Sequence, residues 1–385
     1  MGSRYLVIPA PRCNWVKEHY LFTKNKKLLL FGFEKMYKHI KWAHQQRQKT
    51  KVLNELGEKP LTWGLMPRGM GDGGLMEDDD YFGYFIPSNV YHCFLIKIAI
   101  WAAKELNLDN EVNELQEYYD DAFECTMEVI RKGAIQEKDG YKWIPGVPGK
   151  TSGSRWAATA SIYPCELIDP FDELATGTIK KLESNKSEGG LPLDTGWLKG
   201  GIWAAIAIDN LAYAHLARGE YDKASDYLYP VINHGSPLFT WCEERMPEPN
   251  SKVITGDLQH TWTPHIVNKF IRDIIIREKE NKLYLLSAIP RFWLSDGFEV
   301  GVNNSFTHFG KVDFTIKREG NILNFDFNIE NINNLEKLLL FIRLPENYNE
   351  LKIIENKENV SFLLKRDLIE ISNVKSSFSI KINFL

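Results

Sequence analysis

Two patterns of apolar positions divide the chain. Up to about residue 280, apolar side chains recur with helical spacing. The stretch 31–50 shows this spacing, and 89–108 is apolar on most of its faces, which is typical of a helix buried among others. The following segment, 110–133, is more amphipathic. The pattern predicts a hairpin with 89–108 as its inner helix and 110–133 as its outer helix.

The same pairing of an inner and an outer helix recurs further along. Segment 200–219 is followed by 221–235, with a short polar break at Gly219 and Glu220, and the last strong helix is predicted over 256–280. We count about eight or nine helices in this way. Repeated hairpins favour a toroid of helix pairs over an α-solenoid, because no repeat of fixed period is visible.

The pattern changes to a period of two near residue 281. The alternating stretches are 282–290, 312–330, 337–345 and 360–373, and "REGN" at 318–321 is a turn inside the second. The sequence therefore predicts a mainly α protein with two domains. Residues 1–280 form an (α/α) toroid that carries the site, and residues 281–385 form an antiparallel β-sandwich.

Composition excludes several kinds of partner. The 385 residues suffice for two domains, and a net charge of −4 without a basic, aromatic-rich cluster excludes nucleic acid. No apolar run is long enough to cross a bilayer, so we expect no membrane partner. No signal peptide is visible, although the opening "MGS" is compatible with a removed one, so the compartment stays open. The sequence indicates no oligomeric state.

The five cysteines are odd in number and form no CxxC pair. We interpret them as scattered buried thiols rather than as disulfides or a zinc site. Aromatic residues make up 12% of the chain, and many lie in loops beside Gly and Pro. Such loops are platforms for sugar rings or simply packed aromatics, and both interpretations stay open.

One region resembles a known superfamily. In residues 241–294 a Trp with a nearby Glu is followed by Gly256-Asp257, by His260 and Trp262, and by "LYLLSAIPRFWLSDG". Segments 64–74 and 84–107 resemble the loop and inner helix of a middle hairpin. Together they resemble the six-hairpin glycosidases, the (α/α)6 toroids that include α-L-rhamnosidases, glucoamylases and trehalases.

The chain departs from that superfamily in three respects. A closed toroid has twelve helices, so either the ring is incomplete or some helices lie in loops that the pattern does not show. Many related enzymes also carry β domains ahead of the toroid, and we recognise none here. In "YFIPSNVY", Ser88-Asn89 stands where related sequences often have Asp-Asn. We therefore place no catalytic acid at this pair.

Glycoside hydrolysis requires two acidic side chains on either side of the scissile bond. The resemblance implies that the Glu in the "FTWCEER" loop is the general base of an inverting reaction. Adjacent residues on an extended loop point in opposite directions, so one of Glu243 and Glu244 faces the substrate. The Trp-x-Glu spacing favours Glu243, and the Glu-Arg pairing of some rhamnosidases favours Glu244; we favour Glu243. An ordinary acidic pair on a solvated loop is the alternative.

The partner acid is expected in "GMGDGGLMEDDDYFGYF", where glycines permit close approach of the backbone to a ligand. Asp72 and Asp80 are the candidates, because they lie beside Gly and Tyr. A solvated acidic loop is the alternative. A calcium site through residues 78–80 is disfavoured because the run lacks the spaced ligands of an EF-hand. We expect neither a metal nor a cofactor.

Further residues are predicted to bind substrate. Asp257 and His260 lie at the predicted start of a helix, where Asp257 is equally suited to cap the helix and His260 to be a core histidine. The loop acid Asp194 lies near Trp197. The remaining candidates are the aromatic residues Trp241, Tyr84 and Trp143.

These residues lead to one hypothesis and two rivals. The hypothesis is a glycoside hydrolase that cleaves an oligosaccharide or polysaccharide with inversion. The first rival is a polysaccharide lyase or sugar epimerase on a similar toroid, with His260, Tyr84 and Arg68 at its site. The second is a carbohydrate-binding protein without catalysis. The sequence has no GxSxG elbow, Walker loop, HExxH or Rossmann motif that would indicate other chemistry.

Overall fold

The computed structural model describes residues 9–70, 82–150, 156–196 and 198–385. The chain divides into two compact units. The helical unit comprises Met1–Gly219 and Tyr227–Pro264, and the β unit comprises Glu220–Asp226 and His265–Leu385. The boundary falls inside the last helix, between Pro264 and His265. The sequence pattern sets it after residue 280 instead, because the strand that directly follows this helix was taken as part of it.

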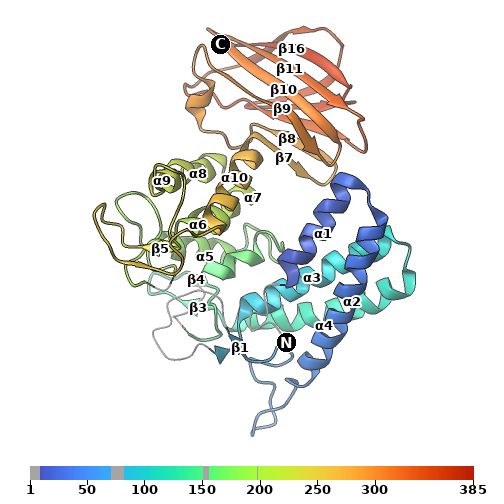
Figure 1. The fold of residues 1–385 in the computed structure, drawn as a ribbon, viewed down its shortest axis with the longest axis vertical. Helices are drawn as coiled ribbons and strands as arrows, with labels where there is room; N and C mark the ends of the chain where they lie inside the picture. The colour runs from blue at the N-terminus through green and yellow to red at the C-terminus, as the bar shows by residue number, and fades with distance from the viewer. Residues whose placement is uncertain (1–8, 71–81, 151–155, 197) are drawn as a thin grey trace. The chain divides into compact units, whose positions relative to one another are not determined.

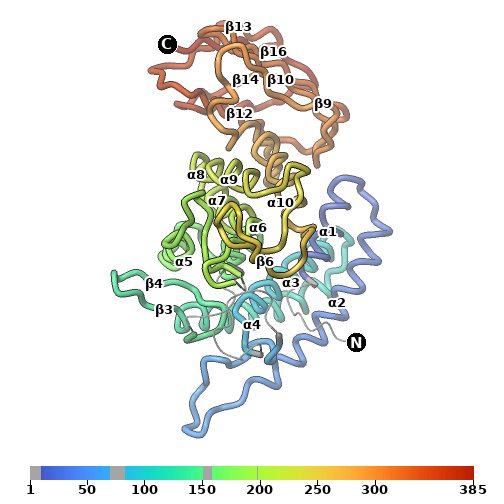
Figure 2. The backbone as a smooth tube through the Cα atoms, turned by 60° about the vertical axis from the view of Figure 1, so that its left-hand side comes forward, coloured from blue at the N-terminus to red at the C-terminus, as the bar shows by residue number. Residues whose placement is uncertain are grey.

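Four long helices open the helical unit, and both ribbon views show them side by side (Figures 1 and 2). They are α1 Pro9–Thr23, α2 Lys26–Gln48, α3 Ile86–Glu105 and α4 Asp109–Lys132. Helix α3 contacts the other three and is buried along most of its length. It is therefore the inner helix that its apolar faces predict.

The second half of the helical unit is more broken. Helix α5 spans Glu173–Glu183, and the run 204–217 consists of α6 Ala204–Ile206, the π-helical turn η2 Ala207–Ala212 and α7 Tyr213–Ala217. The predicted helix over 221–235 is two short helices, α8 Tyr221–Ser225, which belongs to the β unit, and α9 Leu228–Asn233. A 3-10 turn, η1, spans Trp156–Ser161.

The sequence pattern misses two helices and gives wrong bounds for a third. Helices α1 and α5 were not predicted, and α10 spans Trp262–Ile275 instead of beginning near Asp257. Its expected last turn is strand β7, Ile276–Lys279, which pairs with β8. The β-branched Ile run that extends the helical pattern favours a strand at this point.

The described residues contain ten α-helical segments, α1–α10, where a closed toroid has twelve helices. The structure thus shows a helical domain, and the described part of the chain does not show a closed ring. Short paired strands connect the helices. They are β1 Gly69–Met70 with β2 Phe82–Gly83, β3 Ile135–Gln136 with β4 Lys142–Trp143, and β5 Glu244–Arg245 with β6 Ile254–Thr255.

The β unit contains two five-stranded sheets. The first has the order β13-β16-β11-β10-β9, formed by Leu351–Asn356, Ser377–Phe384, Ile322–Glu330, Gly310–Glu319 and Glu299–Thr307. The second has the order β14-β15-β12-β8-β7, in which the first four strands span Ser361–Lys365, Leu368–Ser372, Lys337–Phe341 and Lys282–Leu285. The 3-10 turn η3, Arg291–Leu294, follows β8. The expectation of purely antiparallel pairing is wrong at one place, because β8 and β12 are parallel.

Alternation of apolar and polar residues builds these sheets. In β10, Val312, Phe314 and Ile316 are buried, while Thr315 between them is exposed. The predicted turn at 318–321 joins β10 to β11, with Gly320 at a φ of +58° that suits glycine. Burying one face of each sheet is the pattern of two sheets packed face to face.

Candidate functional site

The segment that carries the two predicted glutamates is one strand of a two-stranded ribbon. Strands β5 and β6 pair antiparallel, with Glu244 opposite Thr255. The pairing extends beyond them, because the Glu243 amide donates to the Asp257 carbonyl over 2.7 Å and the His260 amide donates to the Trp241 carbonyl over 2.8 Å. We call residues 241–246 and 253–260 the site ribbon.

The Glu244 carboxylate is buried beneath another loop. Its side chain is fully covered, and the Leu198 amide donates to Oε2 over 2.9 Å. A Cβ at Gly196 would lie 2.7 Å from this carboxylate, and one at Gly201 would lie 3.0 Å from Oε1. Loop 194–201 therefore needs small residues where it covers Glu244, and this contact joins the loop to the site ribbon.

The Glu243 carboxylate lies apart from that loop, beside Gly256. It is half-buried, and its Oε2 accepts from the Asp257 amide over 3.1 Å. Gly256 has a φ of +72°, and a Cβ there would lie 2.0 Å from Oε2. Both its backbone conformation and its contact with Glu243 thus require glycine. The side chains of Glu243 and Glu244 therefore contact different parts of the protein, as expected of adjacent residues on a strand.

His260 belongs to a cluster of three rings. Its centroid lies 5.9 Å from those of Trp203 and Trp262, which are themselves 5.5 Å apart, and all three pairs meet edge to face. Trp203 is buried, whereas His260 and Trp262 are half-buried. Such pairs add directional attraction to the burial of area. The sequence did not indicate Trp203 as a site residue, because it lies in an apolar segment that predicts an inner helix.

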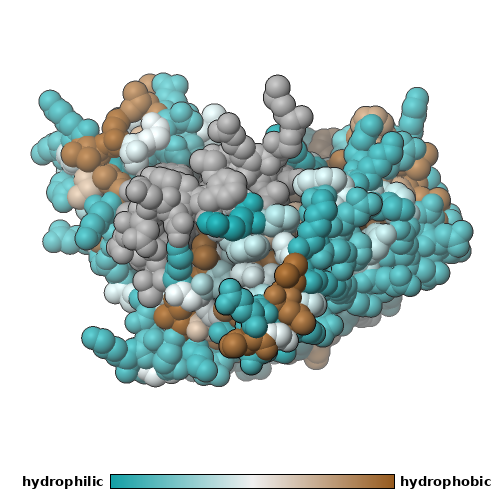
Figure 3. Space-filling model, turned by 90° about the horizontal axis from the view of Figure 1, so that it is seen from below, coloured by the Kyte–Doolittle hydropathy of each residue, from teal (hydrophilic) through white to brown (hydrophobic). Residues whose placement is uncertain are grey.

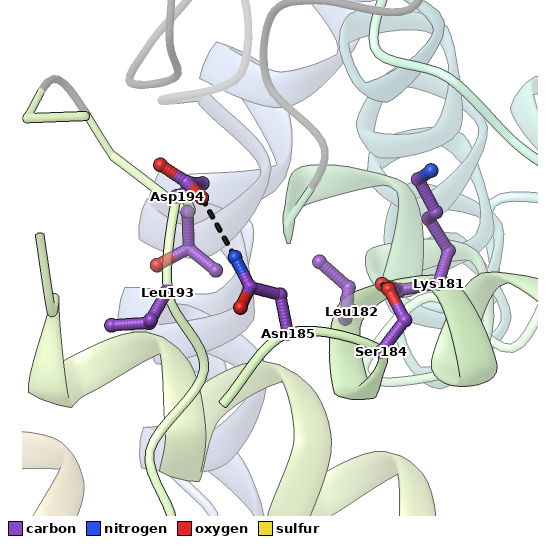
Figure 4. Close-up of a pocket in the computed structure, with 7 residues that line it drawn as sticks. Lys181, Leu182, Ser184, Asn185, Leu193 and Asp194 are labelled. Atoms are coloured by element: carbon purple, nitrogen blue, oxygen red, sulfur yellow. Dashed lines mark hydrogen bonds between the residues drawn. The ribbon is translucent and has the colours of Figure 1, made fainter. Parts of the chain in front are cut away.

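Asp257 is exposed and contributes its backbone rather than its side chain to the ribbon. The expectation that it caps a helix is wrong, because α10 begins five residues later, at Trp262. Asp194 instead shapes its own loop. At a φ of +57°, it accepts from the Gly200 amide over 2.6 Å and from Asn185 Nδ2 over 2.9 Å, the bond drawn in Figure 4.

Two of the predicted tryptophans are interior residues. Trp241 is 4% exposed, and its indole N–H donates to the Val231 carbonyl over 2.9 Å. Trp143 is 1% exposed, and its indole N–H donates to Glu137 Oε1 over 2.8 Å. The expectation that these rings are open platforms for sugars is therefore corrected: both pack in the interior. Tyr84, in contrast, is half-buried and follows β2.

Exposed apolar side chains accompany the site ribbon. They are Leu238, Phe239, Val253, Ile254 and Leu258. The view from below shows a mainly hydrophilic face on which apolar side chains form small, separate patches (Figure 3). Scattered patches of this kind are normal for a folded protein and do not by themselves indicate a partner.

No family model matches the sequence, and no curated protein matches it. Among solved structures, the α-L-rhamnosidase from Dictyoglumus thermophilum is similar over 94% of this chain and 38% of its own, with a TM-score of 0.54 and 14% identity. The native α-L-rhamnosidase from Aspergillus terreus is similar over 94% of this chain and 37% of its own, with a TM-score of 0.51 and 13% identity.

The chain shares its fold with α-L-rhamnosidases. This confirms, at the level of fold, the resemblance to the six-hairpin glycosidases that the sequence motifs indicate. The chain spans about 38% of the length of the Dictyoglumus enzyme, so the similarity concerns one part of a longer structure.

Three predicted residues lie outside the described part of the chain: Asp72, Asp80 and Trp197. The strands on either side of residues 71–81 are described, and they pair with Gly69 opposite Gly83. Nearby, Asn89 is buried, with Oδ1 accepting from the Met66 amide over 2.7 Å and Nδ2 donating to the Phe85 carbonyl over 2.8 Å. Asn89 thus fixes the start of α3 to the preceding loop.

Within the described ranges, no group of three or more His, Cys, Asp or Glu side chains is arranged to hold a metal ion. In the same ranges, no helix combines the length and apolarity needed to cross a membrane. All five cysteines are described and free. Cys93, Cys125 and Cys165 are buried as expected, whereas Cys13 and Cys242 are half-buried, so the expectation that all five are buried is wrong for these two.

Proposed function

We propose that this protein is a glycoside hydrolase that cleaves an oligosaccharide or polysaccharide with inversion at the anomeric carbon. Glu243 would take a proton from water while the water oxygen bonds to that carbon. The glycosidic C–O bond would break as its oxygen receives a proton from an aspartic acid. The fold shared with α-L-rhamnosidases supports this reaction class. Because one fold hosts several functions, the proposal rests on the residues of the site.

The observation that carries the proposal is the different surroundings of the two glutamates. Glu244 is fully covered and bound by the Leu198 amide, as expected of a structural anchor. Glu243 is half-buried, its Oε2 is oriented by the Asp257 amide, and its Oε1 has no hydrogen-bond partner among the described residues. One fixed oxygen and one free oxygen suit a carboxylate that must orient and deprotonate a water molecule.

The acid would come from the loop that joins β1 and β2, with Asp72 and Asp80 as its candidates. Inverting enzymes hold their two carboxyl groups about 6.5–9.5 Å apart, which leaves room for the water. We expect one of these two side chains at that distance from Glu243. Hydrolysis by this route requires water and the two carboxyl groups, and no cofactor.

Half-buried and exposed groups on the same loops would bind the sugar. Trp262 and Tyr84 are suited to contact ring faces, while His260 and the Asp257 side chain are suited to hold hydroxyl groups. Asp194 and Trp197 would contribute from loop 194–201. We also propose that the helices form an (α/α) toroid, or part of one, with these loops gathered at one end.

The test is digestion of a substrate panel, with products read by mass and by the NMR signal of the first anomer formed. The panel begins with α-L-rhamnosides, because both similar structures are α-L-rhamnosidases. It continues with neutral and uronate-containing oligosaccharides. Products heavier by one water, with inverted configuration, support the proposal. Unsaturated products would indicate a lyase, and binding without turnover would indicate a carbohydrate-binding protein; either result would refute it.

A further inference from the structure

The two sheets of the β unit end in four edge strands, β13 and β9 in one sheet and β14 and β7 in the other. An edge strand presents unpaired N–H and C=O groups, so native proteins usually protect it with charges, bulges or proline. Three of these edges are protected in this way. The pairing of β13 with β16 and that of β9 with β10 each contain a register shift, and β7 consists of Ile276 followed by three charged residues.

Strand β14 is different, because its edge is regular and open. Its five residues pair with β15 in unbroken register, and no other described strand pairs with it. The backbone groups on its free side have no hydrogen-bond partner among the described residues. Its one charged residue, Lys365, lies at the end of the strand, with its ammonium group 3.1 Å from the Glu370 carboxylate of β15.

The middle of this edge is apolar and exposed. Phe362 is 41% exposed and Leu363 is 54% exposed, while Leu364 is half-buried. The register with β15 places Phe362 and Leu364 on the face that carries the buried isoleucines of β15, and Leu363 on the opposite face. A strand added at this edge would therefore cover apolar side chains on both faces of the sheet.

An antiparallel strand of the same sequence is complementary to this edge. Two copies of β14 can pair about a two-fold axis at Leu363. Leu363 then lies opposite its own counterpart, and Phe362 lies opposite Leu364. Ser361 lies opposite Lys365, so no like charges face each other. Every residue of β14 thus has a compatible partner in this register.

Neighbouring registers are less favourable. With the axis at Leu364, Leu363 would lie opposite Lys365, and with the axis at Phe362, Leu363 would lie opposite Ser361. Both arrangements replace an apolar pair by an apolar side chain against a polar one. The apolar pattern of β14 therefore specifies Leu363 as the centre.

The contact is short, so the association should be weak. Five residues at about 3.4 Å each give about 17 Å of paired edge, which buries less than the about 1,200 Å2 at the lower end of stable complexes. We expect a Kd of about 10–100 μM, at which the monomer dominates in dilute solution.

We infer that two copies of this chain associate through β14, as a two-fold antiparallel pair of strands centred on Leu363. The five-stranded sheet that contains β14 would then continue into the same sheet of the second copy. The inference uses residues of the β unit alone and does not depend on the proposed function.

The first test is the mass of the chain in solution, measured by sedimentation between about 1 and 500 μM. The mass should rise from 44.5 kDa towards twice that value. Leu363→Lys should weaken the association at least about tenfold, because two like charges would face each other at the axis. Leu56→Lys is the control at another exposed leucine, 81% exposed, and should associate normally. A monomer at all concentrations, or equal association of the two variants, would overturn the inference.

The second test addresses the register. Leu363→Cys would bring two thiols together across the axis, because opposite side chains have Cβ atoms about 4.5–5.5 Å apart, so oxidised glutathione should produce a disulfide-linked dimer. Ser361→Cys is the matched control, since its counterpart would lie about 14 Å away. The native cysteines are the same in both variants, and thermal unfolding shows whether each variant is folded. No link in a folded Leu363→Cys, or equal linking in the two variants, would contradict the proposed pairing.

Discussion

Two glycines determine where the neighbouring carboxylates of the site ribbon lie. Gly196 leaves space for Glu244 beneath loop 194–201, and Gly256 leaves space for Glu243 on the opposite strand. Because a methyl group would displace either carboxylate, the orientation of both acids depends on residues distant from them in the sequence. A displacement of about 1 Å is enough to reduce catalysis substantially.

Gly256→Ala tests this dependence. Its φ of +72° costs any L residue about 1 kcal/mol, and the new Cβ would collide with Glu243 Oε2. Gly57→Ala is the control, because Gly57 has a similar φ of +76° with nothing within 4 Å of the added atom. We expect both variants to lose similar stability on urea denaturation, and only Gly256→Ala to lose activity, by about 100-fold. Equal activity in the two variants would contradict the role assigned to Gly256.

Sequence reasoning identified the acidic pair but not the surroundings of each acid. Alternation along a strand separates Glu243 from Glu244, yet the covering of Glu244 depends on Leu198, which no local pattern connects to it. Trp143 and Trp241 were misjudged because an aromatic residue beside Gly or Pro reads the same whether it is packed or open.

Among the elements, helix α5 ends in a network that holds the turn leading to Asn185 and Asp194. Glu183 Oε1 accepts from Tyr227 Oη over 2.5 Å and lies 3.1 Å from His215 Nε2, and Lys186 Nζ lies 3.2 Å away. Burial raises the pKa of Glu183. The hydrogen bonds from His215 and Tyr227 and the nearby charges of His215 and Lys186 outweigh burial and lower the pKa to about 2.

This network makes stability depend on pH in a defined direction. Because the folded pKa of Glu183 lies below its ordinary value of 4.5, the ionised carboxylate stabilises the fold above about pH 4.5, and this contribution is lost as the pH falls towards 2. We expect Glu183→Gln to lose about 1–2 kcal/mol at neutral pH, because solvent screens the partly exposed carboxylate, and to show a shallower loss of stability on acidification. Chemical denaturation at several pH values measures this. Exposed Glu188→Gln is the control, and identical pH profiles for the two variants would refute the assignment.

In the β unit, Asp222 of α8 accepts from two arginines. Arg291 Nε and Nη2 donate to its two oxygens over 2.8 and 2.9 Å, and Arg343 Nη2 donates over 2.6 Å. The hydrogen bond from Arg291 and the charge of Arg343 lower the pKa of Asp222. Arg343 is 5% exposed, so removing the carboxylate would leave a covered guanidinium without its ion pair.

Asp222→Asn should therefore destabilise the protein by about 1–3 kcal/mol, because a buried charge loses its partner. The comparison is Glu280→Gln, which breaks the exposed Lys282–Glu280 pair at 3.7 Å and should cost less than about 0.5 kcal/mol. Denaturant midpoints give both values. A loss in Asp222→Asn no larger than that in Glu280→Gln would show that the arginine contacts do not stabilise the fold.

Periodicity predicted the elements whose environment is uniform along their length. Segments 31–50, 89–108 and 110–133 were recognised as helices for this reason, and the β10–β11 hairpin was recognised from its alternation and turn. Strand β7 was assigned to a helix, because its first residue, Ile276, continues the preceding apolar pattern, whereas pairing with β8 decides its conformation. The parallel pairing of β8 with β12 was equally hidden, since alternation does not specify a strand's partner.

For the whole molecule, the helical unit and the β unit together share a fold with two α-L-rhamnosidases over 94% of this chain. That similarity shows the fold, while the proposed reaction depends on the different surroundings of Glu243 and Glu244. We propose Glu243 as the base of a glycoside hydrolase and Glu244 as its structural neighbour.

The most direct measurement compares Glu243→Gln with Glu244→Gln on the best substrate of the panel, with kcat, substrate affinity and thermal unfolding recorded for each. We expect Glu243→Gln to lower kcat by about 10²–10⁴-fold, to bind substrate normally and to unfold like the unmodified protein. Glu244→Gln should be less stable but retain most of its activity when folded. Full activity in Glu243→Gln, or loss of catalysis in a stable Glu244→Gln alone, would show that Glu243 is not the base.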